Sequence, residues 1–330
     1  MTRPGRRDRN DAIVSAIVPV TVAVTTYNDG ELLAEALESV AAQTVKPAEI
    51  IVVDDGSEPA TAPGVIRRLE SAQAMSVEYH RQANAGPSAA RNRGLALATQ
   101  PLIAYLDADD RWRPEHLERK VERMNALPDS HSTVYDACVE FDHATGLWLK
   151  TIPVGGYDGS IAGARLGLPG GVPAGMPFQL HRVKALRQVG GFDTSLRVNE
   201  DFDLLLRLAK CGYAIAGSAE ATLERRVRPD SLTKRDPART LAESERFLAK
   251  AEHQGLMSAS AISERRKWAR FRAGKALGFV DGGERRGAEL MRDAFRFGPP
   301  RGLVQWVAFL ATRSLWLGTH GLRLARRYWR

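Results

Sequence analysis

Three carboxylates cluster directly after an apolar run near the middle of the first half of the chain. Residues 102–106 read Leu-Ile-Ala-Tyr-Leu, which predicts a buried strand, and Asp107, Asp109 and Asp110 follow it. Acids this close repel one another unless a positive charge lies among them. A hard divalent cation such as Mg²⁺ or Mn²⁺ takes oxygen ligands and bridges carboxylates to substrate phosphates. Aspartate is also favoured in turns and helix caps, so these three residues alone leave both interpretations open.

Acids also gather at two other points of the chain. Residues 54–57 read Asp-Asp-Gly-Ser after the β-branched run 50–53, and Glu200 and Asp201 open a predicted helix. A carboxylate can accept the imide proton of uracil, and one that faces a substrate hydroxyl can act as a general base. Both segments are also stable without a ligand, because Asp favours turns and helix N-termini attract acids.

The elements that must position these acids alternate between strand and helix. Strands are predicted at 20–25, 50–53, 77–80 and 102–106, and helices are predicted after Asp29 as cap, at 67–74 and at 87–98. The alternation predicts an α/β fold with a Rossmann-like, mostly parallel sheet and helices on both faces. Ligands bind beyond the carboxyl ends of the strands in such sheets, which is where the polar turns fall.

The second half of the chain changes in character. Residues 153–177 are rich in Gly and Pro and predict a long binding loop or lid. Residues 240–296 show helical periodicity and predict a helical appendage of two or three helices. The expected division is a basic extension over 1–18, an α/β domain over 19–235 and a helical region over 236–330.

The charge, the apolar runs and the cysteine content of the sequence indicate what kind of partner the protein has and where in the cell it is found. The net charge of +8 and the pI near 9.7 indicate an anionic partner. Residues 295–330 contain no acid and interleave arginines with tryptophans, which fits either a helix on an anionic membrane or a helix packed on the domain. No uninterrupted apolar run in the sequence is long enough to span a membrane. The basic N-terminus is a poor fit to a signal peptide. Cys138 and Cys211 form no disulfide pattern, so a reducing compartment is expected. A cytoplasmic protein, or one peripheral to the inner face of the membrane, is therefore expected.

Five short sequence motifs, taken in their order along the chain, resemble those of family 2 glycosyltransferases with the GT-A fold. The motifs are VTTYN at 24–28, IIVVDDGS at 50–57, NAGPSAARN at 84–92, YLDADD at 105–110, and GGFD at 190–193 with EDFDL at 200–204. The resemblance covers roughly residues 20–235. It implies a GT-A domain that uses Mg²⁺ or Mn²⁺ and a UDP- or dTDP-linked sugar. One sugar would move, with inversion, to a hydroxyl of a glycan, a lipid-linked or another cell-envelope acceptor, and nucleic acid is not an expected partner.

The resemblance also implies roles for individual residues. The residues expected to contact the donor nucleotide are Thr25, Tyr27, Asp54, Asp55, Arg91, Asp107 and Arg228. The expected metal ligands are Asp109, Asp107 and Asp110. Asp201 is the expected general base, and Glu200 and Asp203 are expected to orient it or to be structural.

Two positions depart from the family pattern. Thr25 stands where a proline is frequent, and Arg228 stands where a histidine is frequent. A cationic side chain cannot ligate a metal, so Arg228 is expected to pair with the diphosphate instead.

Two other functions stay open at this point. A non-catalytic protein could use the same fold and its basic charge to hold a nucleotide or an anionic surface, although Asp107, Asp109, Asp110 and Asp201 bring such a surface no benefit. A Mg²⁺-dependent nucleotidyltransferase also joins a nucleotide-binding sheet to acids. That class usually has a Gly-rich loop after the first strand, and residues 25–30 do not form one.

Overall fold

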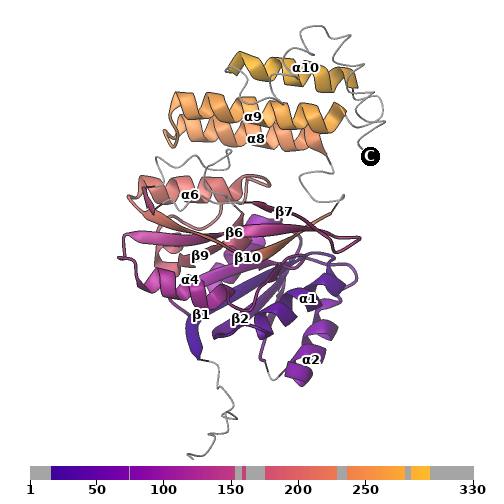
Figure 1. The fold of residues 1–330 in the computed structure, drawn as a ribbon, viewed down its shortest axis with the longest axis vertical. Coiled ribbons are helices and arrows are strands. Elements are labelled where there is room, and N and C mark those ends of the chain that lie inside the picture. The colour runs from indigo at the N-terminus through magenta and orange to yellow at the C-terminus, as the bar shows by residue number, and fades with distance from the viewer. Residues whose placement is uncertain are drawn as a thin grey trace, which may run out of the picture.

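One ten-stranded sheet forms the centre of the molecule (Figure 1). The computed structural model describes residues 16–73, 75–152, 158–160, 175–228, 236–278 and 284–297. The strand order is β3-β2-β1-β4-β9-β6-β10-β5, with β7 paired to β6 and β8 paired to β10. Most of the loop predicted at 153–177, the extension up to residue 15 and the basic segment from residue 298 lie outside the described residues.

The first half of the sheet is parallel, as the sequence predicted. The strands are β1 (Ile17–Thr26), β2 (Lys46–Asp54), β3 (Glu78–Arg81) and β4 (Leu102–Asp107), and the connecting helices are α1 (Gly30–Ala41), α2 (Ala62–Gln73) and α3 (Pro87–Leu97). The register sets Thr25 beside Asp107 and Thr26 beside Asp54. The polar turns after β1, β2 and β4 therefore meet at one edge of the sheet.

The second half of the sheet is mixed rather than parallel. Its elements are β5 (Arg111–Trp112), α4 (His116–Asn125), β6 (His131–Asp142), β7 (Trp148–Ile152), β8 (Asp158–Ser160), β9 (Gln179–Arg182), α5 (Val183–Gln188), α6 (Glu200–Lys210) and β10 (Ala214–Val227). β9 runs antiparallel between β4 and β6, whereas β10 runs parallel to β6. The sequence did not predict β9, because a short strand with Gln179, His181 and Arg182 carries no apolar run.

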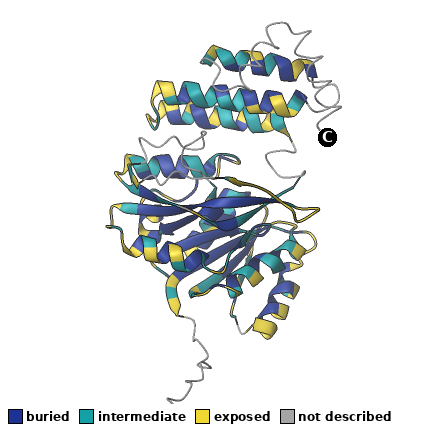
Figure 2. Ribbon diagram, viewed as in Figure 1, coloured by how far each residue is buried: buried dark blue, intermediate teal, exposed yellow. Residues whose placement is uncertain are grey.

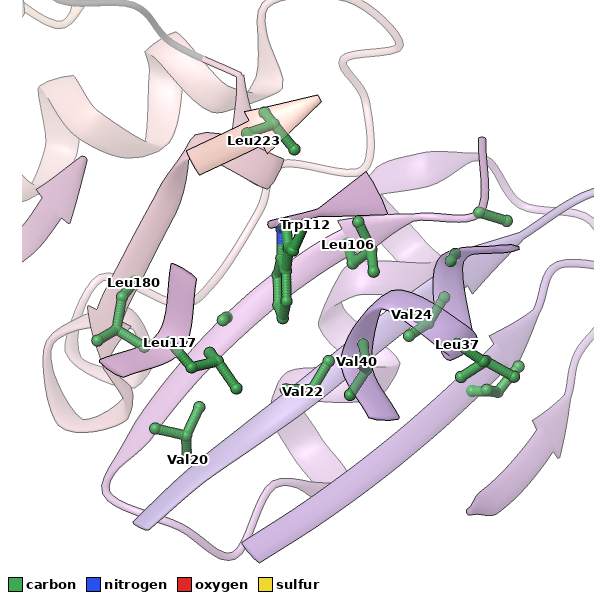
Figure 3. Close-up of a cluster of buried hydrophobic side chains, with 14 of the residues drawn as sticks. Val20, Val22, Val24, Leu37, Val40, Leu106, Trp112, Leu117, Leu180 and Leu223 are labelled. Atoms are coloured by element: carbon green, nitrogen blue, oxygen red, sulfur yellow. The ribbon is translucent and has the colours of Figure 1, made fainter. Parts of the chain in front are cut away.

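Apolar side chains cover both faces of the sheet. On one face, Val20, Val22 and Val24 of β1 pack against helix α1 and the ring of Trp112 (Figure 3). On the other face, Tyr105 meets Phe192 edge to face with ring centroids 5.4 Å apart. The strands are buried and the outward faces of the helices are exposed (Figure 2), as is expected for a sheet covered on both sides.

Three helices follow the sheet: α8 (Pro237–His253), α9 (Ala259–Gly278) and α10 (Glu284–Ala294), and the last continues into a 3₁₀ turn, η3 (Phe295–Phe297). Phe247 and Leu248 of α8 share a core with Leu204 of α6. Lys250 Nζ also donates to Asp193 Oδ2 at 2.6 Å and to Asp203. Helix α8 is thereby docked on α6, as Figure 1 shows. The placing of a domain boundary at residue 235 stays a prediction.

Candidate active site

A single arginine joins the acid at the end of β4 to the acids that open α6. Arg91 of α3 donates from Nη2 to Asp107 Oδ1 at 2.9 Å and from Nη1 to Glu200 Oε1 at 2.7 Å. Thr25 Oγ1 donates to the same Asp107 oxygen at 3.2 Å. Burial alone would lower the pKa of Arg91, but the charges of Asp107 and Glu200 outweigh it and raise that pKa. Arg91 is therefore a permanent cation whose planar fork sets the distance between two acid-bearing elements.

The expected general base, Asp201, lies next to this bridge in the first turn of α6. Its Oδ1 accepts from the Phe202 backbone N–H at 2.7 Å. Burial and the neighbouring Glu200 raise the pKa of Asp201 well above its usual range. Asn199, which precedes the helix, has a left-handed φ of 65° that asparagine tolerates better than most residues. A half-buried carboxylate whose proton affinity is raised in this way is suited to accept a proton from a hydroxyl group that reaches it.

Asp109 lies between like charges and one cation. Burial and the nearby Asp107 raise the pKa of Asp109 to about 6, although Arg228 opposes the shift. Arg228 reaches Asp109 Oδ2 with Nη2 at 3.3 Å and Asp29 Oδ1 with Nη1 at 2.5 Å. Arg228 is thus beside the expected metal ligand. Asp29 stands at the N-cap of α1 as predicted, but its side chain makes no cap hydrogen bond and pairs with Arg228 instead.

The acids fit a cation that shares its ligands with substrate. Within the described part of the chain, no three Asp, Glu, His or Cys side chains come together to hold a metal unaided. Asp110 is buried, and its Oδ1 accepts from the Arg226 backbone N–H at 2.9 Å, which ties it to β10. Asp107 and Asp109 remain as the better-placed donors. Mg²⁺ and Mn²⁺ sites of this kind use one or two carboxylates and complete the shell with phosphate and water.

Asp54 and Asp55 hold backbone turns through internal hydrogen bonds. Asp54 is fully buried and accepts from the Ser57 N–H at 2.8 Å and from the Tyr79 hydroxyl at 2.9 Å. Asp55 accepts from the N–H groups of Ala85 and Gly86 at 3.0 and 2.8 Å. Contact of either carboxylate with a nucleotide base therefore stays a prediction. Tyr27, also expected in the base pocket, is half-exposed.

A groove that the sequence analysis did not predict opens beside these turns. Its volume is about 520 Å³, and its lining consists of Gly56, Glu58, Arg81, Gln82, Ala83 and Asn84. Gln82 Nε2 donates to Asp55 Oδ1 at 2.8 Å, which connects the groove to the turn after β2. A side chain at Gly56, whose φ is +85°, would bring its Cβ within 2.8 Å of the Asn84 nitrogen. The glycine in the 54–57 turn was the available signal for this close approach.

One residue of the helical region, Arg265, lies beside the candidate active site, and the sequence analysis did not predict it. The Arg265 guanidinium of α9 lies 3.8 Å from the ring centroid of Phe202, the neighbour of Asp201. Burial lowers the pKa of Arg265 to about 10, although Asp201 opposes that shift. No spacing in the sequence connects residue 265 with residue 201, so only the packing of α9 reveals this neighbour.

The chain is similar to known glycosyltransferases in sequence and in fold. Residues 21–167 match the family described as glycosyl transferase family 2. The chain carries a glycosyl transferase family 2 domain. This domain holds the Arg91 bridge to β4, whereas Asp201 lies beyond the matched residues.

Several curated relatives contain a similar domain. The chain is 41% identical over 103 residues to an uncharacterised glycosyltransferase of Nostoc, a match that covers 31% of this chain and 32% of the relative. The succinoglycan biosynthesis protein ExoO of Rhizobium meliloti is 28% identical over 68% of this chain and 65% of its own length. The amylovoran biosynthesis glycosyltransferase AmsB of Erwinia amylovora is 27% identical over 59% and 65%. The chain thus spans less than two thirds of each of these relatives.

Two solved structures share the fold over nearly the whole chain. TarS residues 1–349 of S. aureus, in complex with UDP-GlcNAc, has a TM-score of 0.60 and 15% identity and covers 94% of this chain and 93% of its own. The mannosyltransferase PcManGT of Pyrobaculum calidifontis, in complex with GDP-Man and Mn²⁺, has a TM-score of 0.58 and 17% identity and covers 96% and 90%. The fold is therefore GT-A, with helices after the sheet.

Proposed function

We propose that this protein is an inverting glycosyltransferase. It moves one sugar from a nucleoside-diphosphate sugar to a hydroxyl of a glycan, lipid-linked or other cell-envelope acceptor. The observation that carries the proposal is the Arg91 bridge, because it brings the acid at the end of β4 next to the acid pair that opens α6. A fold that only bound nucleotides would have no use for a half-buried carboxylate at Asp201 beside those acids.

The proposed donor site lies at the carboxyl ends of β1, β2 and β4. Thr25, Tyr27, Asp54 and Asp55 border the base, and the groove beside Asp55 has room for a ligand of nucleoside size. Three further residues contact the ribose or diphosphate, namely Arg91, Asp107 and Arg228. The complexes of TarS with UDP-GlcNAc and of PcManGT with GDP-Man support a nucleotide-sugar donor.

A divalent cation completes the proposed donor site. Asp109 and Asp107 would hold it, and Asp110, the third expected ligand, is tied to β10 because its Oδ1 accepts from the Arg226 backbone N–H. When bound, Mg²⁺ or Mn²⁺ stabilises the negative charge that develops on the departing nucleoside diphosphate. The Mn²⁺ in the PcManGT complex and the raised pKa of Asp109 both support this assignment.

Asp201 acts as the general base in the proposed reaction. It removes the proton from the acceptor hydroxyl while that oxygen forms a bond to the sugar C1. The bond from C1 to the diphosphate breaks on the opposite face, so the configuration at C1 inverts. Glu200, held by Arg91, keeps the first turn of α6 in place and raises the proton affinity of Asp201.

The acceptor is proposed to belong to a surface polysaccharide, in line with the names of ExoO and AmsB. The site itself does not distinguish a glycan from a lipid-linked acceptor. Among the described residues, no helix is long and apolar enough to cross a membrane. A peripheral membrane contact through residues 295–330 stays a prediction, since residues from 298 onward lie outside the described residues.

The test is a panel of UDP-, dTDP- and GDP-linked sugars, each with Mn²⁺ or Mg²⁺, measured by thermal shift and by hydrolysis of the donor. We expect one donor class to stabilise the protein only when the metal is present. Asp201→Asn should keep that shift and lower donor turnover by about 10²–10⁴-fold, the usual contribution of a general base. Asp109→Ala should abolish the metal dependence of the shift.

The matched control is Asp129→Asn, which also removes one carboxylate, from a side chain that is 99% exposed. This control should behave as the unaltered protein does. Donor binding without turnover by any protein in the series would favour a non-catalytic nucleotide-binding protein. Unchanged turnover in Asp201→Asn would move the base assignment to Glu200 or Asp203.

A further inference from the structure

Arg226, near the end of β10, holds the turn that carries the acid cluster. Its backbone N–H donates to Asp110 Oδ1 at 2.9 Å, and its side-chain Nε donates to the backbone carbonyl oxygen of Asp109 at 2.9 Å. Two bonds from one residue therefore join β10 to two consecutive residues of the turn. The side-chain bond ends on the main chain of Asp109, so it fixes the backbone of this residue and leaves the carboxylate oxygens to other partners.

The guanidinium group of Arg226 is itself held by α1 and β6. Nη2 donates to Glu35 Oε2 of α1 at 2.6 Å, and the group lies over the Phe141 ring of β6 with Cζ 4.7 Å from the ring centroid. Arg111, which follows the acid cluster, lies over the same ring at 4.4 Å and reaches the same Glu35 oxygen at 3.5 Å. The Arg226 side chain is only 6% exposed. An arginine that is packed and bonded in this way is a rigid donor to Asp109.

A second arginine close to this turn makes a different contact. Arg228 approaches the Asp109 carboxylate, with Nη2 at 3.3 Å from Oδ2, and it also pairs with Asp29. Arg228 therefore acts on the charge of the Asp109 side chain, whereas Arg226 acts on the position of the Asp109 main chain.

We propose that Arg226 is a positioning residue for the metal ligand Asp109. Its Nε–H holds the Asp109 main chain, and with it the carboxylate, in one position after β4. Partners that hydrogen-bond to metal ligands typically contribute about 10- to 100-fold to metal affinity. The inference rests on the proposed function, because it takes Asp109 as a metal ligand, and it deepens that function by naming the residue that sets the position of this ligand.

The positive charge of Arg226 and its hydrogen bond to Asp109 act on metal binding in opposite directions. A cation beside the acid cluster repels a divalent metal ion, so removal of the charge alone should strengthen metal binding. Loss of the hydrogen bond should weaken metal binding, because Asp109 would no longer be held in one position. The sign of the change in metal affinity therefore separates a positioning role from a purely electrostatic one.

The experiment compares two neutral replacements in the full chain, Arg226→Gln and Arg226→Met, which remove the same charge. The glutamine amide nitrogen is as many bonds from the backbone as Nε, so it can still donate to the Asp109 carbonyl, whereas methionine has no donor. The readout is the Mn²⁺ concentration at half of the maximal thermal shift with UDP or GDP present. Each variant is compared with its own metal-free melting temperature. Arg226→Met should need about 10- to 100-fold more Mn²⁺ than Arg226→Gln.

A second measurement requires no ligand. Hydrogen exchange of the backbone amides over 105–112, followed without metal or nucleotide, should be faster in Arg226→Met than in Arg226→Gln. Equal exchange in the two variants would mean that the side-chain bond does not hold the turn, which overturns the proposal.

Arg182→Met is the matched control. Arg182 also donates from Nε to a backbone carbonyl oxygen, that of His131 at 3.0 Å, but its register partner is Leu102 at the other end of β4. This variant should lose stability and keep the Mn²⁺ requirement of the unaltered protein. An increase as large as that in Arg226→Met overturns the proposal, and so does an equal requirement in Arg226→Met and Arg226→Gln. If the unaltered protein shows no Mn²⁺-dependent shift with either nucleotide, the proposed function fails and the positioning role with it. That result is distinct, because it appears before any substitution.

Discussion

Arg91 is the residue on which the geometry of the site depends most. Its two terminal nitrogens serve different elements: one contacts Asp107 on β4 and the other contacts Glu200 on α6. A lysine carries the same charge but presents one compact group, so it cannot occupy both positions at once. If Arg91 released either acid, the negative charge of that carboxylate would remain partly buried without a cationic partner.

We therefore predict that Arg91→Lys lowers the free energy of unfolding by about 1–3 kcal/mol, the usual cost of a buried group that loses a charged hydrogen bond. Donor turnover should fall as well, because α6 is no longer held against β4. Urea unfolding and donor hydrolysis measure the two effects. Arg93→Lys, on an exposed side chain of the same helix, is the control and should change neither. Full stability in Arg91→Lys would show that the bridge is not needed to hold α6.

At the scale of the element, the helical region depends on close approach between α9 and α10. A Cβ on Gly287 would lie 2.5 Å from the Gly274 carbonyl oxygen and 2.7 Å from the Gly278 nitrogen. Both contacts are with backbone atoms, which cannot turn aside as a flexible side chain can. The absence of a side chain at Gly287 is therefore what allows the two helices to touch.

We predict that Gly287→Ala lowers the free energy of unfolding by about 1–3 kcal/mol, as overpacking usually does, despite the better helix propensity of alanine. Gly64→Ala is the matched control, because nothing lies within 4 Å of a Cβ at that position of α2. The control should be neutral or stabilising by up to about 1 kcal/mol. Thermal unfolding of both variants checks the pair, and equal melting temperatures would mean that α9 and α10 do not pack closely.

For the whole molecule, two buried histidines connect stability to pH. His181 of β9 lies between β4 and β6 and shares a hydrogen bond of 2.9 Å with Thr133 Oγ1. Burial, with a smaller contribution from Lys120, lowers the pKa of His181 to about 3. Burial and the same lysine also lower the pKa of His116 well below its usual range. Between pH 6.5 and about 3, the unfolded chain therefore binds a proton at position 181 that the folded chain does not, and His116 acts in the same direction.

The sign of the effect follows from that difference. Stability is fully present above pH 6.5 and decreases as the pH falls toward 3, by up to about 1.4 kcal/mol per pH unit for each histidine. We predict that His181→Asn reduces the slope of unfolding free energy against pH by about that amount between pH 6 and 4. Urea unfolding at pH 7, 6, 5 and 4 measures it. The exposed His253→Asn is the control. A slope that His181→Asn leaves unchanged would mean that this ring titrates normally in the folded protein.

Several features of this protein could be predicted from its sequence because they depend on local patterns. Apolar runs and helical spacing predicted β1, β2, β4, α1 and α3, and the parallel order of these strands places the polar turns at one edge. The sequence motifs typical of family 2 predicted that Asp107, Asp109 and Asp201 belong to one active site. The GT-A fold, which the resemblance to family 2 implied, was predicted correctly.

Only the tertiary structure decided how distant segments meet. The antiparallel β9 has a polar sequence and is a strand only because β4 and β6 flank it. The two contacts of Arg91, the pairing of Arg228 with Asp29 and the approach of Arg265 to Phe202 all join residues far apart in the chain. Local patterns cannot encode such contacts, because each depends on the packing of whole elements. A sequence can show which residues are able to do chemistry, whereas the packed fold determines which of them lie within reach of one another.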